Sequence, residues 1–512
     1  MSRTSRFLSG IGFGYASQIL TTLVGFGLTP FLLYRVGQHD YGLWLVGTQL
    51  MAYLALLDLG IIALLPRETA FATGRAPTIE EASDLPLIFG HTVRIILWQM
   101  PLVVLGVLIF WFAMPSDWAE LRNPIRLVLL AFAATFPLRI FRAVLTGLQD
   151  LAYLGRISIV CYLLGTATTV GLVFAGWGLY ALAIGWTLQQ FAEAFACWYR
   201  MRTQFPTVLP RKLPPMPWST ARTRLTQGGW VSLMQVAQVL LYGTDILIIG
   251  KVFGPAAIVP FVITGKLVGV LTNQPQMLMA LAGPALSQMR MGESRKRLSD
   301  VCIALSQAML MLSGAAVCVV LAINQGFVGR WVGAGQYGGF WLTALILVSM
   351  LLRHWNLTVA YSLFCFGYER RLCLTAFTDG MVTGVAMFLF IRAFGLIGAP
   401  LGTITGACLI SLPANLRALA RENEVSVGRL IRPLGPWFLR FVFLVVGVFF
   451  LARIWIPGTF LLLGLTATAI ATIYLVVMFP LALRSPLGDY VRPRLFPIRA
   501  RVFRVLRLGD AA

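Results

Sequence analysis

The sequence predicts an all-α polytopic membrane protein with about 14 transmembrane helices. We expect two six-helix lobes related by pseudo-two-fold symmetry, plus two extra C-terminal helices. The 512 residues are 58% hydrophobic and only 12% charged, with a mean hydropathy of +0.81. Apolar runs longer than ~18 residues recur from end to end. The formal charge of +22 lies mostly in short connections, which indicates membrane topology rather than nucleic-acid binding.

Fourteen apolar runs are candidate membrane spans. The first follows Arg3 and Arg6. It is too long for a signal-peptide core and lacks a clear cleavage site, so we expect a membrane helix. The predicted spans are 11–34, 41–65, 90–114, 125–147, 152–175, 177–200, 225–250, 256–282, 300–323, 338–366, 372–394, 396–419, 436–456 and 459–483.

The distribution of Lys and Arg predicts that both termini are cytoplasmic. When residues at the span edges are counted with the adjoining connection, seven of the 41 such residues lie in the odd-numbered connections and three lie within spans. The other 31 lie at the N-terminus, in the even-numbered connections and in the C-terminal tail. Cytoplasmic connections carry the excess of positive charge in membrane proteins, so this split fixes the expected orientation.

Three short patterns recur at nearly constant spacing, which predicts an internal repeat. They occupy matching places in the two halves, at offsets of 216, 217 and 220 residues: Tyr34-Arg35-Val36 with Gly250-Lys251-Val252, the segment 178–185 with 395–402, and 147–150 with 367–370. Six spans per repeat is an even number, so the two repeats have the same orientation in the membrane.

This repeat sets the expected domain organisation. We predict a six-helix lobe over 1–200, a cytoplasmic linker over 201–224, a second lobe over 225–420 and two additional helices over 436–483. The tail, 484–512, contains seven Arg among apolar residues. It is either a segment that lies on the anionic inner leaflet or a disordered topogenic tail.

No segment has the pattern of a catalytic domain, so we expect neither an enzyme nor a cofactor. The stretch around Lys266 fails as a phosphate-binding loop, because Pro260 and Leu267 stand where the motif needs Gly and Ser or Thr. The seven cysteines have no CxxC spacing, and the three histidines form no metal-ligand pattern, so we expect no metal site.

Ionisable residues inside the spans are the candidate site residues, because a charge at mid-membrane costs roughly 2.5–3.5 kcal/mol. We expect Arg353 and Lys266, both near mid-span, to line a cavity that binds an anionic cargo, although a structural ion pair within the bundle is the alternative. Asp58, Asp245, Glu193 and Asp379 are candidates for coupling or gating. For Asp245, a pair with Lys251 or with a helix end is equally compatible. The secondary cationic candidates are Arg94, Arg139 and Arg142, for which anchoring at the interface is the favoured interpretation.

Three stretches resemble the polysaccharide-transporter flippases of bacteria: 40–44 (DYGLW), 57–61 (LDLGI) and 145–149 (LTGLQ). That family forms a superfamily with the multidrug and toxin extrusion exporters and the lipid II flippases. The lipid II flippases carry a key arginine in the first helix, whereas 11–34 is uncharged here. The drug exporters usually have twelve spans and use acidic residues of the N-terminal lobe, for which Asp58 is the only candidate in the first two spans.

The resemblance implies a flippase of the bacterial inner membrane. Such a protein moves undecaprenyl-diphosphate-linked oligosaccharide from the inner to the outer leaflet, for surface polysaccharide or exopolysaccharide synthesis, by alternating access around a cationic cavity. The implied partners are the lipid-linked oligosaccharide and membrane lipids, with polysaccharide polymerase machinery as a further candidate. A multidrug or metabolite antiporter of the same fold and a lipid II flippase are the alternatives.

Overall fold

The computed structural model describes residues 3–75 and 84–492, and within these ranges the chain forms helices and turns without a β-strand. Packing divides the chain into two compact units, Met1–Val259 and Pro260–Ala512. Residues 493–512, the larger part of the predicted basic tail, lie outside the described residues.

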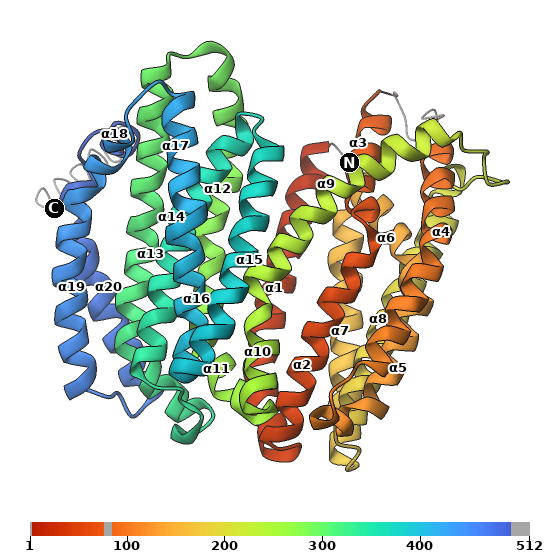
Figure 1. Ribbon diagram of the computed structural model, residues 1–512, viewed down its shortest axis with the longest axis horizontal. Helices are drawn as coiled ribbons and strands as arrows, with labels where there is room; N and C mark the ends of the chain where they lie inside the picture. Colours follow the sequence, from red (N-terminus) through yellow and green to blue (C-terminus); the bar gives the residue numbers. More distant parts are fainter. Residues whose placement is uncertain (1–2, 76–83, 493–512) are drawn as a thin grey trace, which may run out of the picture. The chain divides into compact units, whose positions relative to one another are not determined.

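Unit 1 contains the first ten helices (Figure 1). They are α1 (Arg3–Arg35), α2 (Gln38–Leu54), α3 (Ile61–Arg75), α4 (Asp84–Phe112), α5 (Ala119–Thr135), α6 (Arg139–Gly147), α7 (Leu151–Phe174), α8 (Leu179–Gln204), α9 (Trp218–Tyr242) and α10 (Thr244–Phe253). Short 3₁₀ turns join several of them, including η1 (Ala55–Asp58), η3 (Phe136–Leu138) and η5 (Pro255–Ala257).

Unit 2 contains the remaining helices, after α11 (Ile258–Thr264), which spans the boundary. They are α12 (Lys266–Gly292), α13 (Arg295–Trp331), α14 (Phe340–Cys365), α15 (Glu369–Phe394), α16 (Gly398–Gly406), α17 (Leu412–Glu422), α18 (Val427–Ile431), α19 (Gly435–Ile454) and α20 (Phe460–Ala482). A π-helical turn, Ala407–Ser411, joins α16 to α17.

The predicted class, an all-helical polytopic membrane protein, is confirmed. In the described chain, nine helical segments are long and apolar enough to cross a membrane, and three bent pairs raise that number to twelve. One of the nine, Glu369–Glu422, folds back on itself at Gly395 and so contains two predicted spans. Helix α8 occupies the predicted sixth span. Each of the 14 predicted spans therefore corresponds to a helix, a bent pair or one arm of this hairpin.

The bends were not predicted, and each interrupts a span that hydropathy shows as continuous. The pair Gln38–Asp58 and Ile61–Gly74 bends by 56°, and the pair Pro255–Thr264 and Lys266–Thr272 bends by 50°. The first bend has a visible cause, because Leu59 and Gly60 adopt positive φ values of 48° and 71°. The carboxylate of Asp58 accepts a hydrogen bond from Gly60 N at 2.8 Å and so holds the break in place.

The sequence repeat recurs in the backbone. Glycines 217 residues apart have the same conformation at the starts of equivalent helices: φ is 96° at Gly37 and 84° at Gly254, and 50° at Gly178 and 69° at Gly395. Left-handed φ values are strained for residues with a Cβ, so these positions require glycine.

A further glycine pair at the same spacing marks the contact between the fifth and sixth spans of each half. A Cβ on Gly185 would lie 2.7 Å from the carbonyl oxygen of Gly165, and one on Gly402 would lie 2.7 Å from Met387 Cα. Both glycines let two helix backbones approach closely, as small residues do throughout membrane proteins. The two halves are thus built on one framework.

Helices α9 and α10, which we assigned to the second lobe, pack within unit 1. A Cβ on Gly228 of α9 would lie 2.6 Å from the carbonyl oxygen of Leu59, so the two backbones cross closely at the α2–α3 break. Arg224 fastens the beginning of α9 to α3 through an ion pair with Glu68 at 3.1 Å. The predicted lobe limits rest on the repeat rather than on packing, and they remain a prediction.

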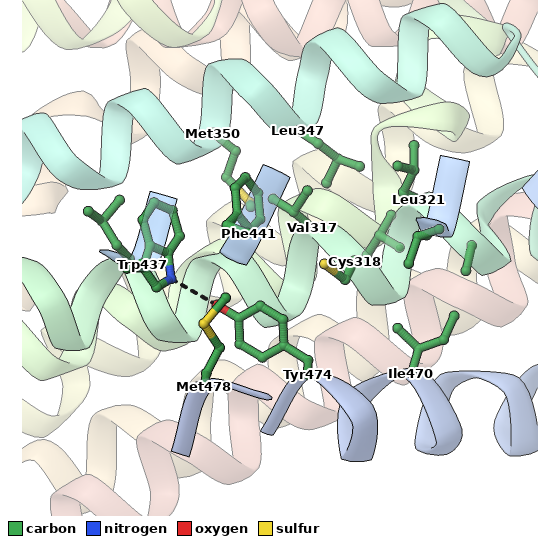
Figure 2. Close-up of a cluster of buried hydrophobic side chains, with 14 of the residues drawn as sticks. Val317, Cys318, Leu321, Leu347, Met350, Trp437, Phe441, Ile470, Tyr474 and Met478 are labelled. Carbon is green, nitrogen blue, oxygen red and sulfur yellow. Dashed lines mark hydrogen bonds between the residues drawn. The ribbon is translucent and has the colours of Figure 1, made fainter. Parts of the chain in front are cut away.

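The two additional helices, α19 and α20, pack on α13 in unit 2 (Figure 2). Trp437 and Phe441 from α19 and Tyr474 from α20 are buried against apolar side chains of α13 and α14. Trp437 Nε1 donates a hydrogen bond to the Tyr474 hydroxyl at 3.1 Å, which satisfies two polar atoms inside an apolar cluster.

Candidate functional site

Unit 1 contains a partly open cavity of about 780 Å³ among α1, α3, η3, α6, α7 and α8. The charged members of its lining are two arginines of α6 and one glutamate of α8: Arg139, Arg142 and Glu193. Small-molecule sites usually measure 300–1,000 Å³, so this cavity has the size of a ligand site. It lies beside the end of α6, which the charge distribution places on the cytoplasmic side.

Arg142 is held at the cavity by residues of two other helices. Its guanidinium pairs with Glu193 of α8, and Nη1 lies 3.3 Å from Ser158 Oγ of α7. Ser158 in turn donates a hydrogen bond to Glu193 at 3.2 Å. The side chain of Arg142 nevertheless stays 50% exposed, so it presents positive charge to the cavity.

Arg139 lies one turn earlier on α6 and is less tightly bound. Its Nη2 is 3.7 Å from Asp58 Oδ2, which is too long for a hydrogen bond, and its Nη1 has no hydrogen-bond partner among the described residues. Asp58 is buried, with its side chain 3% exposed, whereas that of Arg139 is 36% exposed. The pair therefore links the α2–α3 break to the cavity and leaves one buried Arg139 donor unsatisfied among the described residues.

The remaining wall includes polar side chains that the sequence analysis missed. Trp186, Gln189 and Gln190 line the cavity from α8, and Tyr162 lines it from α7. The α8 residues share one helix face with Glu193, because positions three, four and seven residues apart face the same way. A search for polar residues at helical spacing within an apolar span would have found them.

Arg353, the leading candidate cation, occupies a different environment. Its guanidinium forms a bidentate pair with the Asp379 carboxylate, with Nη2 3.1 Å from Oδ1. The same Nη2 donates to the Thr383 hydroxyl and to the Thr403 carbonyl oxygen, each at 3.2 Å. The side chains of Arg353 and Asp379 are only 7% and 1% exposed. These contacts agree with the alternative interpretation of Arg353, in which it forms a structural ion pair within the helix bundle and does not line a cavity.

The other candidates are dispersed. Lys266 is half-buried at the α11–α12 bend, and no hydrogen bond or ion pair joins it to another described residue. Arg94 donates to the Leu213 carbonyl oxygen of the linker at 3.3 Å, outside the cavity. Asp245 accepts from Ile246 N at 2.8 Å at the start of α10, whereas Lys251 lies 3.8 Å from Asp117.

One cluster near the starts of α2 and α5 has ligand atoms suited to a metal ion. His39, Asp40 and Glu120 bring one such atom each within 4.8 Å of the others, and His39 Nε2 lies 3.3 Å from Glu120. The spacing of the three histidines in the sequence did not predict this cluster. Asp40 and Glu120 also stand in first helical turns, where a carboxylate is favourable without a metal.

Comparisons with known proteins agree with this fold. Residues 92–330 match the model of a family described as polysaccharide biosynthesis protein. The lipid II flippase MurJ in an inward closed conformation is similar over 93% of this chain and 100% of its own, with a TM-score of 0.66 and 11% identity. An inward-facing multidrug resistance MATE transporter is similar over 79% of this chain and 96% of its own, with a TM-score of 0.59 and 16% identity. No curated protein shows a significant sequence match to the chain.

The family match over 92–330 covers helices that surround the cavity, from α5 to α8, and the structural likeness extends over most of the chain. These findings confirm the resemblance drawn from the short motifs. Residues 92–330 therefore match a polysaccharide biosynthesis family, and the chain as a whole has the fold that the MurJ flippase and the MATE transporter share.

Proposed function

We propose that this protein is a flippase that moves undecaprenyl-diphosphate-linked oligosaccharide from the inner to the outer leaflet of the bacterial inner membrane by alternating access. The observation that carries the proposal is the unit 1 cavity, where Arg139 and Arg142 contribute guanidinium groups to the lining. A diphosphate cannot enter the hydrocarbon core unpaired, because burying an unpaired charge is prohibitive. Guanidinium groups bind phosphate oxygens through paired hydrogen bonds, while the prenyl tail can stay in lipid.

The charge balance of the cavity disfavours a cationic cargo. The two acidic side chains beside it, Asp58 and Glu193, each face an arginine. An exporter of cationic drugs needs a carboxylate that is free to pair with its cargo, whereas here the less engaged group is Arg139. An anionic cargo therefore fits better, and Asp58 and Glu193 remain candidates for coupling. Roles for Asp245 and Asp379 in coupling or gating, and for Lys266 in binding the cargo, remain predictions.

The proposal is tested by polysaccharide export in a deletion strain that expresses variants of the cavity arginines. We expect Arg139→Gln with Arg142→Gln to abolish export and to leave lipid-linked precursor on the inner leaflet, at normal protein abundance. Arg139→Lys keeps the charge but loses the planar fork, so export should fall only partly. Arg94→Gln is the matched control, because Arg94 is a cation outside this cavity. Normal export by an abundant double variant would refute the assignment of the site.

We also propose that both termini are cytoplasmic, which sets the direction of transport. Topology reporters inserted after Lys212 in the linker and after Gln336 before α14 should report opposite sides, inside and outside respectively. The same side for both insertions would contradict the orientation without affecting the cavity assignment.

A further inference from the structure

The part of the cavity formed by Trp186, Gln189, Gln190 and Tyr162 adjoins the charged groups and carries no formal charge itself. On α8, Trp186 precedes Glu193 by seven residues, which is about 10 Å along a helix. With the predicted orientation, α8 runs from the outer side towards the cytoplasm, so Trp186 lies deeper in the membrane than the Arg142–Glu193 pair. The cavity thus has a charged section and a deeper section without formal charge.

Polar groups of this deeper section have unused hydrogen-bonding capacity. The side chains of Gln189, Gln190 and Trp186 make no hydrogen bond to any described residue. The Tyr162 hydroxyl has partners within the bundle, the Thr166 side chain and the Thr21 carbonyl oxygen at 3.5 Å, so the unused capacity lies on α8. An amide at membrane depth without a partner is costly, so these groups require water or a polar ligand.

The chemistry of the deeper section selects a neutral, hydroxyl-rich ligand. The two amides offer carbonyl acceptors and N–H donors to neighbouring hydroxyl groups. The indole of Trp186 offers a broad apolar face, which suits the C–H face of a pyranose ring and is of little use to a phosphate. A prenyl chain is a poor occupant, because it would leave both amides unsatisfied. The volume of about 780 Å³ leaves room for sugar beside a diphosphate.

We propose that Trp186, Gln189, Gln190 and Tyr162 form a glycan-binding subsite that holds the sugar next to the diphosphate. This inference rests on the proposed function, and it adds that the protein recognises the carbohydrate as well as the anion. The diphosphate lies at Arg139 and Arg142, and the adjoining sugar stacks on Trp186 with its hydroxyls on the two glutamines.

The test compares two probes on the purified full-length protein in nanodiscs. One is farnesyl diphosphate, and the other is the same prenyl diphosphate carrying a single N-acetylglucosamine. We expect the sugar to strengthen binding by about tenfold, and Trp186→Leu to remove most of that gain while leaving the affinity for farnesyl diphosphate within about twofold. Gln190→Leu should remove part of the gain, and Trp186→Phe should retain part of it, since it keeps an aromatic face.

Trp177→Leu is the matched control, because Trp177 is 52% exposed at the α7–α8 turn and lies outside the cavity. Equal affinities of the two probes for the unaltered protein would overturn the subsite. An equal loss for both probes in Trp186→Leu would also overturn it, because that loss reports a structural role. In either case, the proposed function would still be supported if farnesyl diphosphate binds and if this binding depends on Arg139 and Arg142. Failure of both probes to bind would contradict the proposed function as well.

Discussion

The two halves of the chain share a framework, but each uses an arginine differently. In unit 1, Arg142 of α6 contacts Ser158 of α7 and Glu193 of α8, and it remains half exposed at a cavity. In unit 2, Arg353 of α14 contacts Asp379 of α15 and the backbone of α16, and it is sealed from solvent. Both arginines lie on the fourth span of their half and connect the fifth span to the sixth.

The difference shows that a charged residue within a membrane span has two distinct uses. A buried, ion-paired guanidinium such as that of Arg353 joins three helices, and little of its charge is left for a ligand. A partly exposed one such as that of Arg142 keeps the capacity to bind an anion. Breaking the Arg353–Asp379 pair should therefore have a different consequence from breaking the Arg142–Glu193 pair. Four predictions test this difference and the shared framework, in order of decreasing expected effect.

The largest effect is expected for Asp379→Ala. This change leaves Arg353 buried without its counter-charge, which costs about 3–5 kcal/mol. We expect little folded protein in the membrane, measured by fluorescence-detected size exclusion of a tagged chain. The double variant Arg353→Met with Asp379→Leu removes both charges and should restore abundance and export. A double variant that is abundant but inactive would instead support Arg353 as a cargo ligand.

Next in size are the framework glycines, which test how far the two halves are alike. Gly185→Ala and Gly402→Ala each insert a methyl group at a close helix contact, at a cost of about 1–3 kcal/mol. We expect similar reductions in melting temperature for the two variants. Gly435→Ala is the control, because no atom lies within 4 Å of a Cβ at that position. A large effect in only one half would contradict the shared framework.

A smaller effect on stability, about 1 kcal/mol, is expected for Asp58→Asn. The asparagine carbonyl can still accept from Gly60 N, so the α2–α3 break should persist. Arg139 then loses its acidic neighbour, and the affinity for farnesyl diphosphate should rise several-fold in a direct binding assay. Weaker binding at unchanged stability would show that Asp58 supports the binding geometry of Arg139 rather than competing with the ligand.

The smallest effect on stability is expected for Glu193→Gln, the counterpart of Asp379→Ala. Arg142 is half exposed, so the loss of its partner should change stability by less than about 1 kcal/mol. The freed guanidinium should raise the affinity for farnesyl diphosphate. A loss of stability as large as that of Asp379→Ala would remove the contrast between the two arginines.

The sequence alone determined the helical class, the positions of the 14 spans and the repeat. These follow from properties carried by neighbouring residues: hydropathy over about 20 residues marks a span, and left-handed turns demand glycine at Gly178 and Gly395. It also identified Arg139, Arg142, Asp58 and Glu193 as charged residues within or beside spans. By sequence alone, Arg353 ranked above Arg139 and Arg142 as a ligand of the cargo. The only criterion was how close each residue lies to the middle of its predicted span.

Only the tertiary structure decided which of these charges face a cavity. Arg353 and Asp379 are 26 residues apart, and Asp58 and Arg139 are 81 residues apart, so neither contact can be inferred from local pattern. Whether an intramembrane arginine is neutralised depends on which carboxylate the packing of separate helices places beside it. The bend at Asp58–Gly60 is likewise set by local backbone geometry, with positive φ at Leu59 and Gly60, because hydropathy is continuous through it.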